Sequence, residues 1–561
     1  MIKTLENRFY YLDNFRAVVE LIRARYRHLL SADEQRFVDG FGDLPQASQA
    51  LLVRMVMRKG ELFRLSKLNY DEIGCTREKM HAAMALCDAG WLDAEPMIDI
   101  EQLFGLLTKA EIVEAFPLLR QNKGARKSQQ LAMLLQAADD IANVPNIARA
   151  RPLAAWHPGI DDRLLQLRIA RLCERMLLMF FGNLHQDWSE FVLSELGIFN
   201  YERVDLSPLS QGFSTRREVD AYLHLHACRE RFRNGETVQT VVADIPAAPY
   251  PNDWLERRRS KLLFQIAQHY ERSGMLADAL RLYADCPWPG ARLRAVRVLE
   301  RCGQPAAAFE LAQLAEQQPE GEAETQQLLR IMPRLRRQLG YKKIAATSAP
   351  QIDQHVLLPP RPEQALPVEA LLEAHLSRAD APAVYVENAL LNSLFSLLFW
   401  DAIFAPLPGA FLHPFQSGPA DLYSPDFRQR RAHHFDSGFA QLDCGEYQQT
   451  ILRNFVAKAN IQSPFVFWGA IDHTLLSMAL TCLPPPHLRK CFERILQDIR
   501  NNRCGLPDLI QFWPAEKRYR MIEVKGPGDR LQDNQIRWLH YFAEQQMPVT
   551  VCYVQWAQEA A

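Results

Sequence analysis

The sequence predicts a multidomain, mostly α-helical protein whose last domain is α/β. The chain has 561 residues, which is too long for a single hydrophobic core. Residues 1–345 read mostly as helices and contain two helix–glycine–helix segments that echo each other. Residues 505–542 read instead as a strand, a turn, a second strand, a tight turn and a helix.

Composition narrows the class of protein. Hydrophobic residues make up 48% of the chain and charged residues 23%, as in an ordinary soluble protein. The net charge of −1 excludes a generally basic, histone-like binder, so any DNA contact has to be a local patch. The 11 cysteines never form a C-x-x-C pair, which argues against structural zinc and suits a reducing compartment. Because no signal peptide or membrane-spanning run is visible, we expect a soluble, intracellular protein without a membrane partner.

Residues 1–75 are expected to form a helical, DNA-binding N-terminal module, because their apolar residues recur at helical spacings. Residues 51–70 carry Arg54, Arg58 and Lys59 between apolar and aromatic residues. This pattern fits the solvated face of an amphipathic helix, and it also fits a patch that follows DNA phosphates.

Residues 76–150 are expected to form a small second domain, in which residues 100–135 resemble a SAP-type helix–extended–helix module. That resemblance implies contacts to the DNA backbone and not to bases. The expected core of this module comprises Leu106, Leu107, Ile112, Leu118 and Leu131. The basic residues at the start of its second helix are Lys123, Arg126 and Lys127. Backbone N–H groups there would accept a phosphate, although a basic loop would also serve solubility alone.

Residues 151–345 are expected to be helical and to include TPR-like repeats. Aligning the two similar segments places Gly274 over Gly303 and Ala279 over Ala308. Small residues at such positions let paired helices pack closely. Two units of this kind would make a scaffold or clamp arm with repair proteins as candidate partners, but they do not make an active site.

Residues 346–385 are proline-rich with little periodicity, so we expect a linker or a wrapped extended segment. The last domain is expected to span residues 386–561 and to open with a helix that begins at Glu387. A glutamate in the first turn interacts favourably with the helix dipole, and that alone would explain Glu387.

Polar residues of the last domain that do not fit an ordinary core are concentrated around one predicted hairpin. Side chains alternate along a strand, so Glu523 and Lys525 share a face, and the hairpin returns them beside Asp508. We expect Asp529 to cap the following helix and Gln535 to lie buried within its apolar stripe. The hairpin would therefore gather two carboxylates, a lysine and an amide at one edge of a small sheet.

Converging carboxylates and a lysine are the groups that phosphodiester chemistry needs. Mg²⁺ and Mn²⁺ prefer carboxylate oxygens, activate water and neutralise a phosphate that is under attack. The lysine supplies a point charge beside the same phosphate. By spacing alone, the pattern P-D…E-x-K also fits an ordinary surface hairpin.

Longer strings of residues resemble one known family. GLPDL, IEVKGPGDRL and the following Q-x-x-WL resemble the VRR-NUC domain of the Fanconi-associated nuclease family. ENALLNSLFSLLFWDAIF, YYLDNF and LLVRMVMRKGELFRLSKLNYDEI are similar to other parts of that family, so the resemblance covers most of the chain. It implies a PD-(D/E)xK, restriction-endonuclease-like α/β fold and metal-dependent cleavage of branched DNA.

The resemblance also implies roles for individual residues. The ligands of one or two Mg²⁺ or Mn²⁺ ions would be Glu387, Asp508, Glu523 and the carbonyl of Val524. Lys525 would position the attacking water or neutralise charge on the phosphate, and Gln535 would orient Lys525 or a DNA phosphate. The implied activity is that of a 5′ flap endonuclease with 5′→3′ exonuclease activity, used in interstrand cross-link repair.

Eukaryotic members of the family carry a ubiquitin-binding zinc finger, and without a C-x-x-C pair we expect no ubiquitin binding here. A bacterial origin then predicts a cytoplasmic or nucleoid location, and a eukaryotic one the nucleus. The alternative is a non-catalytic DNA-binding scaffold that recruits repair proteins through its helical repeats. A scaffold would not need Asp508, Glu523 and Lys525 together.

Overall fold

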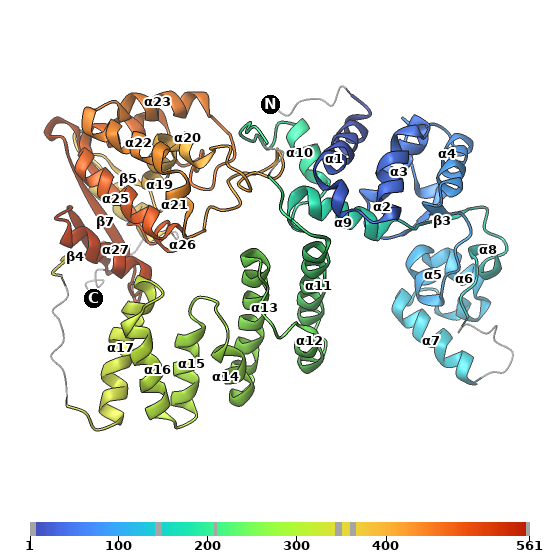
Figure 1. Ribbon diagram of the computed structural model, residues 1–561, viewed down its shortest axis with the longest axis horizontal. Helices are drawn as coiled ribbons and strands as arrows, with labels where there is room; N and C mark the ends of the chain where they lie inside the picture. The colour runs from blue at the N-terminus through green and yellow to red at the C-terminus, as the bar shows by residue number, and fades with distance from the viewer. Residues whose placement is uncertain (1–6, 141–148, 207–209, 343–349, 359–365, 557–561) are drawn as a thin grey trace, which may run out of the picture. The chain divides into compact units, whose positions relative to one another are not determined.

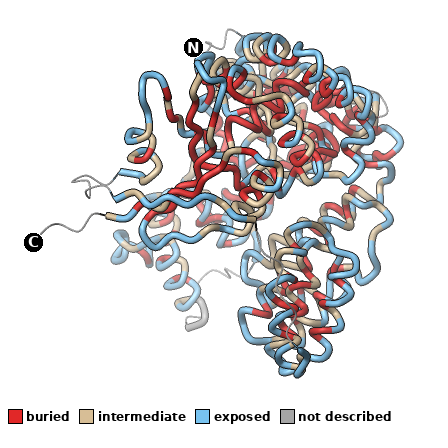
Figure 2. Tube along the Cα trace, turned by 90° about the vertical axis from the view of Figure 1, so that its left-hand side faces the viewer, coloured by how far each residue is buried: buried red, intermediate tan, exposed pale blue. Residues whose placement is uncertain are grey.

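The computed structural model describes residues 7–140, 149–206, 210–342, 350–358 and 366–556. The described chain is mostly helical, as predicted, and Figure 1 labels its helices and strands. It divides into two compact units, Met1–Asn200 with Pro208–Arg216 and Tyr201–Ser207 with Arg217–Ala561. Buried residues lie inside the helical layers and along the strands (Figure 2).

The first unit begins with four helices, α1 (Tyr10–Tyr26), α2 (Ala32–Gly40), α3 (Gln46–Val56) and α4 (Thr76–Asp88). Phe15, Val18 and Ile22 recur three to four residues apart on α1 and are all buried. A capping box starts α2: the Ser31 side chain accepts from the Glu34 N–H, and the Glu34 side chain accepts from the Ser31 N–H. The predicted helical start of the chain is therefore confirmed.

A small antiparallel sheet joins these helices, and the sequence did not predict it. Its strands are β1 (Leu62–Arg64), β2 (Leu92–Asp93) and β3 (Leu164–Leu167), in the order β1-β3-β2. Two helices follow in the same unit, α9 (Ala170–Phe181) and α10 (Ser189–Glu195). Because β3 pairs with both β1 and β2, residues 164–167 fold with the N-terminal part, and the first unit continues to residue 200.

The SAP-like region consists of α5 (Ile100–Leu106), α6 (Lys109–Ala115), α7 (Lys127–Asp140) and α8 (Leu153–Trp156). Leu107 and Ile112 are buried as predicted, and the predicted core leucines at 106 and 131 are partly buried. Leu118 was assigned wrongly, because it is 58% exposed and Leu119 is buried instead. A 3₁₀ helix that starts at Pro117 has three residues per turn, and this tighter winding directs Leu119 inward.

Seven helices form the arm of the second unit: α11 (Arg216–Arg233), α12 (Val238–Asp244), α13 (Asp253–Arg272), α14 (Leu276–Ala284), α15 (Ala291–Arg301), α16 (Pro305–Gln317) and α17 (Glu322–Gln338). The two aligned segments form the helix pairs α13–α14 and α15–α16 (Figure 1). Gly274 and Gly303 occupy the turns with φ of 79° and 71°, a conformation that favours glycine. Ala279 and Ala308 are fully buried, as expected for close helix packing.

A five-stranded mixed sheet organises the last domain. Its strands are β4 (Asp353–Leu357), β5 (Ala383–Tyr385), β6 (Leu509–Trp513), β7 (Arg518–Lys525) and β8 (Val549–Val554). The order is β4-β8-β7-β6-β5; the pairs β5–β6 and β6–β7 are antiparallel, and the pairs β7–β8 and β8–β4 are parallel. The predicted β6–β7 hairpin is therefore confirmed as the centre of an α/β domain.

Helices cover both faces of this sheet. On one face, α18 (Val368–Leu376) buries Leu372 against Leu509, Ile522 and Val524. The large core on the other face is built from α19 (Leu390–Leu398), α20 (Trp400–Ile403), α21 (Phe427–Arg430), α22 (Ala432–Cys444), α23 (Tyr447–Ala457), α24 (His473–Cys482), α25 (Pro485–Gln497), α26 (Ile499–Asn502) and α27 (Asp533–Glu544). Because β7 is covered on both faces, polar groups on it lie in a dry environment.

The helical arm and the sheet domain are joined within one compact unit. The last arm helix, α17, packs against α27 (Figure 1). Arg330 on α17 pairs with Asp533 at 2.7 Å, and Arg494 on α25 pairs with Glu322 at 2.6 Å. Both ion pairs fix the end of the arm beside the helices that cover the sheet.

Two expectations about the start of the last domain are wrong. Residues 346–385 are not only a linker, because β4, α18 and β5 lie within them and complete the sheet. Residues 346–349 and 359–365 of this segment are not among the described residues. The first helix, α19, begins at Leu390 and not at Glu387, which lies in a turn. Over the part of the chain that is described, no helix combines the length and apolarity needed to cross a membrane.

Candidate active site

Asp508 and Glu523 face each other where β6 begins and β7 approaches its end. The antiparallel register pairs Leu509 with Ile522, which places Asp508 opposite Glu523. The Val524 N–H donates a hydrogen bond of 2.8 Å to Asp508 Oδ2. Both carboxylates are buried, with 6% of Asp508 and 0% of Glu523 exposed. The hairpin thus brings the two acidic groups together in a dry environment.

Lys525 lies on the same face of β7 as Glu523. Its Nζ donates to Glu523 Oε1 over 2.6 Å and to the Val524 carbonyl oxygen over 3.0 Å. Only 7% of Lys525 is exposed. Its ammonium therefore compensates one of the two buried negative charges, and the group formed with Asp508 keeps a net charge of −1.

Burial raises the pKa of both carboxyl groups. The pKa of Asp508 rises to about 6, chiefly by desolvation; a backbone hydrogen bond and Lys525 oppose the rise, while the charges of Glu387 and Glu369 add to it. The pKa of Glu523 rises to about 7 by desolvation and by the charge of Asp508, against the effect of Lys525. At neutral pH, the positive charge of Lys525 therefore does not fully balance the two buried carboxyl groups of Asp508 and Glu523.

The donor set fits a divalent cation. Glu523 Oε2 is buried without a hydrogen-bond partner in the described chain, and an ion is a natural partner for such an oxygen. Carboxylate and carbonyl oxygens are the ligands that hard cations such as Mg²⁺ and Mn²⁺ prefer. Across the described residues, no three His, Cys, Asp or Glu side chains are close enough to form a complete metal-binding group. Asp508 and Glu523 are therefore two candidate ligands, and a third ligand would have to come from a neighbouring segment.

Glu387 is the candidate that the sequence predicts for a third carboxylate, and its charge raises the pKa of both Asp508 and Glu523. The Val386 N–H donates to the Asp508 carbonyl oxygen over 2.8 Å, which continues the β5–β6 pairing and holds the turn of Glu387 beside the site. Glu387 is exposed, and its Oε2 accepts from the Tyr385 hydroxyl at 2.5 Å while its Oε1 accepts from Asn388 Nδ2 at 3.2 Å. Burial, and next the hydrogen bond to Glu387 and the charge of that carboxylate, raise the pKa of Tyr385, so its phenol remains a donor at neutral pH. The helix-dipole explanation does not apply, because Glu387 precedes the helix.

Three family models match the chain: "FAN1, HTH domain" over residues 9–93, "Fanconi anemia-associated nuclease SAP domain" over residues 97–156, and "VRR-NUC domain" over residues 443–556. A Fanconi-associated nuclease 1 homolog from Pseudomonas aeruginosa is 51% identical over 98% of this chain and 96% of its own length. The chain belongs to the Fanconi-associated nuclease family.

More distant and structural relatives point the same way. The Fanconi-associated nuclease 1 homolog of Arabidopsis thaliana is 23% identical over 96% of this chain and 66% of its own length. The crystal structure of paFAN1 bound to 2nt 5′ flap DNA with gap has a TM-score of 0.93 and 50% identity, covering 99% of this chain and 100% of that one. The VRR-NUC match includes Asp508, Glu523 and Lys525 but begins after Glu387. The HTH match runs to residue 93, so the first module extends beyond the predicted boundary at residue 75.

Two residues of this family member lie differently from the prediction. Gln535 is only partly buried, and its Oε1 accepts from the Gln532 N–H at 2.9 Å in a capping box at the start of α27. Asp529 does not cap that helix; it accepts from the Gly526 N–H at 3.0 Å and closes the turn after β7. The glutamine at position three of a helix is the usual capping-box partner, and this spacing could have been recognised in the sequence.

Three residues beside the site were missed by sequence reasoning. Tyr385 and Asn388 contact Glu387, and the charge of Glu369 on α18 contributes to the raised pKa of Asp508. Tyr385 and Glu369 fall in the segment read as a linker, where no motif indicated a function. Only the chain path, which pairs β5 with β6 and packs α18 against β5, places them here.

The basic residues of the first module divide into paired and exposed groups. Arg54 donates from Nε and Nη2 to Glu72 Oε1 at 2.8 and 2.6 Å and lies 3.8 Å from the centre of the Tyr11 ring. Its guanidinium therefore serves packing within the module. Arg58 and Lys59 are exposed at the end of α3, where they line two adjoining cavities.

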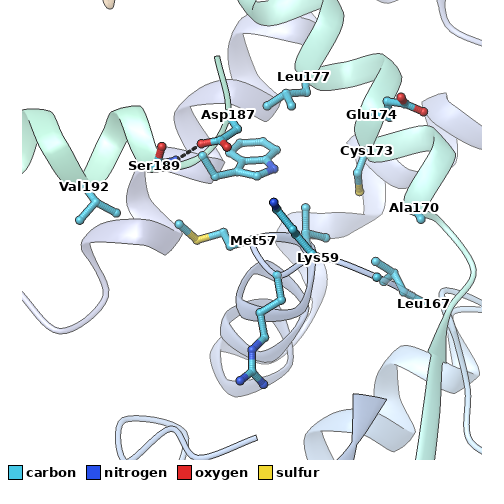
Figure 3. Close-up of a pocket in the computed structure, with 14 residues that line it drawn as sticks. Met57, Lys59, Leu167, Ala170, Cys173, Glu174, Leu177, Asp187, Ser189 and Val192 are labelled. Atoms are coloured by element: carbon cyan, nitrogen blue, oxygen red, sulfur yellow. Dashed lines mark hydrogen bonds between the residues drawn. The ribbon is translucent and has the colours of Figure 1, made fainter. Parts of the chain in front are cut away.

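Those two cavities differ in charge. The first, of about 420 Å³, receives the Lys59 side chain and carries Asp187 and Glu174 on its walls (Figure 3). The second, of about 400 Å³, lies between β1 and α5 and is lined by Arg58, Lys59 and Lys67. The second cavity is the more suitable one for a phosphate, because none of the described residues that line it is an aspartate or a glutamate.

Basic residues of the SAP-like region lie at the start of α7, as the sequence predicts. Lys123 and Arg126 are exposed. Lys127 is less available, since its Nζ donates to the Phe104 carbonyl oxygen at 3.0 Å. The side chains that extend toward solvent at this helix start are therefore Lys123 and Arg126.

Proposed function

We propose that this protein is a structure-selective, metal-dependent DNA nuclease that cleaves 5′ flaps and has associated 5′→3′ exonuclease activity. The observation that carries the proposal is the buried group of Asp508, Glu523 and Lys525 in a chain that is 51% identical to a Fanconi-associated nuclease 1 homolog. The related paFAN1 is bound to 5′ flap DNA in its crystal structure, which supports flapped DNA as the substrate. We place the activity in DNA repair, including that of interstrand cross-links.

The protein's own residues have definable tasks in this reaction. Asp508, Glu523, Glu387 and the Val524 carbonyl would hold one or two Mg²⁺ or Mn²⁺ ions. When bound, such an ion supplies a water of lowered pKa and neutralises charge on the scissile phosphate. Lys525 holds a fixed positive charge beside the carboxylates, where it can interact with a phosphate oxygen or an attacking water. Burial of the pair excludes bulk water and strengthens each of these electrostatic interactions.

DNA backbone contacts are assigned to the exposed basic residues of the first unit. Arg58, Lys59, Lys123 and Arg126 supply the phosphate contacts, with Lys67 added because it lines the same cavity as Arg58. Repair proteins that bind the helical arm remain a prediction from the sequence.

A cleavage assay tests the proposal. We expect the full-length protein to cut a labelled 5′ flap when Mg²⁺ or Mn²⁺ is present and not in EDTA. Glu523→Gln should abolish cleavage, because the amide keeps the shape but loses the charge that attracts the cation. Glu516→Gln is the matched control: this exposed glutamate lies in the turn of the same hairpin and should leave the rate unchanged.

The same assay separates the enzyme from a non-catalytic scaffold. A scaffold would bind the flap with the same affinity in both variants and would cut it in neither. Cleavage by Glu523→Gln at the wild-type rate in Mn²⁺ would overturn the assignment of the site.

A further inference from the structure

Glu387 is the ligand candidate that the sheet holds least firmly, because it lies outside β5 and α19 and is exposed. Its backbone belongs to a turn closed by the Ala389 N–H, which donates to the Val386 carbonyl oxygen over 2.8 Å. Asn388 in this turn has φ of 53°, in the left-handed region where asparagine is better tolerated than most residues. The turn therefore presents the Asn388 side chain in a direction that ordinary helical or extended backbone would not give.

The Asn388 side chain joins Glu387 to the strand of Asp508. Its Nδ2 donates to Glu387 Oε1 at 3.2 Å, and its Oδ1 accepts from the Leu506 N–H at 3.2 Å. Leu506 is two residues before Asp508. Both contacts require the same orientation of the amide, because a reversed amide would direct its oxygen at a carboxylate and its NH₂ at an N–H. One side chain thus contacts the carboxylate and the segment that leads into β6.

A second asparagine fixes the backbone of the same turn. Asn392, which is 2% exposed, donates from Nδ2 to the Asn388 carbonyl oxygen at 2.7 Å and to the Arg503 carbonyl oxygen at 2.8 Å. The turn before α19 is therefore tied to residues 503–506 by two side-chain bridges. Any shift of Asn388 relative to residues 503–506 would break hydrogen bonds of the buried Asn392 amide.

The Tyr385 hydroxyl donates to the other oxygen of the carboxylate, Glu387 Oε2. Tyr385 is the last residue of β5, whose partner in β6 is Leu509, the neighbour of Asp508. Each oxygen of Glu387 consequently has one donor, and both donors are anchored to the segment that carries Asp508. A carboxylate oxygen that accepts one hydrogen bond retains lone-pair capacity for a cation.

We propose that Asn388 and Tyr385 are positioning residues that hold the Glu387 carboxylate in place relative to Asp508 for cation binding. The proposal rests on the proposed function, since it needs a metal site at Asp508 and Glu523. Groups that hydrogen-bond a metal ligand commonly contribute a factor of about 10 to 100 in metal affinity. We expect each of these two side chains to contribute through Glu387 and not through the stability of the domain.

Binding of Mn²⁺ to the full-length protein without DNA tests this role, with the free ion followed by electron paramagnetic resonance. Tyr385→Phe removes only the hydroxyl, and Asn388→Gly removes the amide while tolerating the left-handed backbone. Each should raise the dissociation constant for Mn²⁺ about 10-fold. Matched controls are Asn460→Gly, at another asparagine with positive φ of 63°, and Tyr541→Phe, whose hydroxyl donates to the Lys490 carbonyl oxygen; both should bind as wild type does.

A double variant shows whether the effect passes through the carboxylate. If Tyr385 acts through Glu387, then Tyr385→Phe should add nothing to the loss already caused by Glu387→Gln. The proposal is overturned if both single variants bind Mn²⁺ like wild type, or if Tyr385→Phe weakens binding equally in the Glu387→Gln background. If Asn388→Gly lowers the melting temperature of the metal-free protein, the test rests on the variant of the half-exposed Tyr385 alone.

Asp508→Ala separates this proposal from the one on which it rests. In one outcome, the wild type and the Tyr385→Phe and Asn388→Gly variants bind Mn²⁺ equally well, and Asp508→Ala does not bind it. That result would refute only the positioning role. Failure of wild type itself to bind Mn²⁺ would remove the metal site and the positioning role together.

Discussion

Replacing Asp508 by asparagine should stabilise the metal-free protein while it destroys activity. Asparagine keeps an oxygen that can accept from the Val524 N–H and removes the charge. Because burial raises the pKa of Asp508 from 3.8 to about 6, the folded protein holds this proton more tightly than the unfolded chain does. Ionisation therefore opposes folding: the penalty is absent below about pH 4 and complete above about pH 7.

The size of the effect follows from the same pKa. A difference of about two pK units corresponds to roughly 3 kcal/mol at pH 8, and to about half as much at pH 5. For a folded unit of this size the change at pH 8 amounts to roughly 4–6 °C in melting temperature. The charge of Asp508 also raises the pKa of Glu523, so removing it relieves a second penalty of the same sign.

Thermal scans of wild type and Asp508→Asn in EDTA at pH 5 and pH 8 measure this difference. With Mg²⁺ the order should reverse, because only wild type gains stability from the bound ion. Asp529→Asn is a matched control, since this carboxylate is exposed in the turn after β7. An Asp508→Asn variant that melts at or below the wild-type temperature at pH 8 in EDTA would refute the argument that burial makes the ionised form of Asp508 unfavourable.

Three further predictions follow from the charges of the two units. Lys525→Met should lower activity at least about 100-fold and destabilise the metal-free protein more at pH 8 than at pH 5, because it removes the cation that pairs with the buried carboxylate of Glu523; thermal scans at both pH values check this. Replacing Arg58, Lys59 and Lys67 by alanine should reduce the salt slope of flap binding by about 0.9 for each lost phosphate contact, and an unchanged slope in fluorescence anisotropy would relocate the DNA surface. Arg54→Ala should instead lower the melting temperature and leave that slope as it is, since its guanidinium pairs within the module.

The β6–β7 hairpin could be predicted from the sequence because everything that defines it is local. Alternation of side chains places Glu523 and Lys525 on one face, and Pro514 marks the end of the first strand. The separation of Asp508 from Glu523 is the length of one hairpin, so no long-range information is needed to bring them together. This is why the centre of the site was found from a short stretch of the chain.

The rest of the sheet depends on pairings between distant segments. β8 pairs in parallel with β7 only after the chain has passed through α27, and β4 pairs with β8 across almost two hundred residues. β4 is also exposed along most of its length, so it shows no alternation of apolar and polar residues. A strand of this kind, beside prolines, has the local pattern of a linker, and only the unpaired edge of β8 explains why it forms.

The site itself spans the boundary that the sequence suggested. A domain starting at residue 386 would lose β5, whose pairing with β6 continues into the Val386–Asp508 hydrogen bond that holds Glu387. It would also lose α18, and Leu509, Ile522 and Val524 would then be uncovered on one face of the sheet. Loss of α18 would also remove the charge of Glu369, which contributes to the raised pKa of Asp508. The segment that reads as a linker therefore completes the sheet and holds the turn of Glu387 beside Asp508.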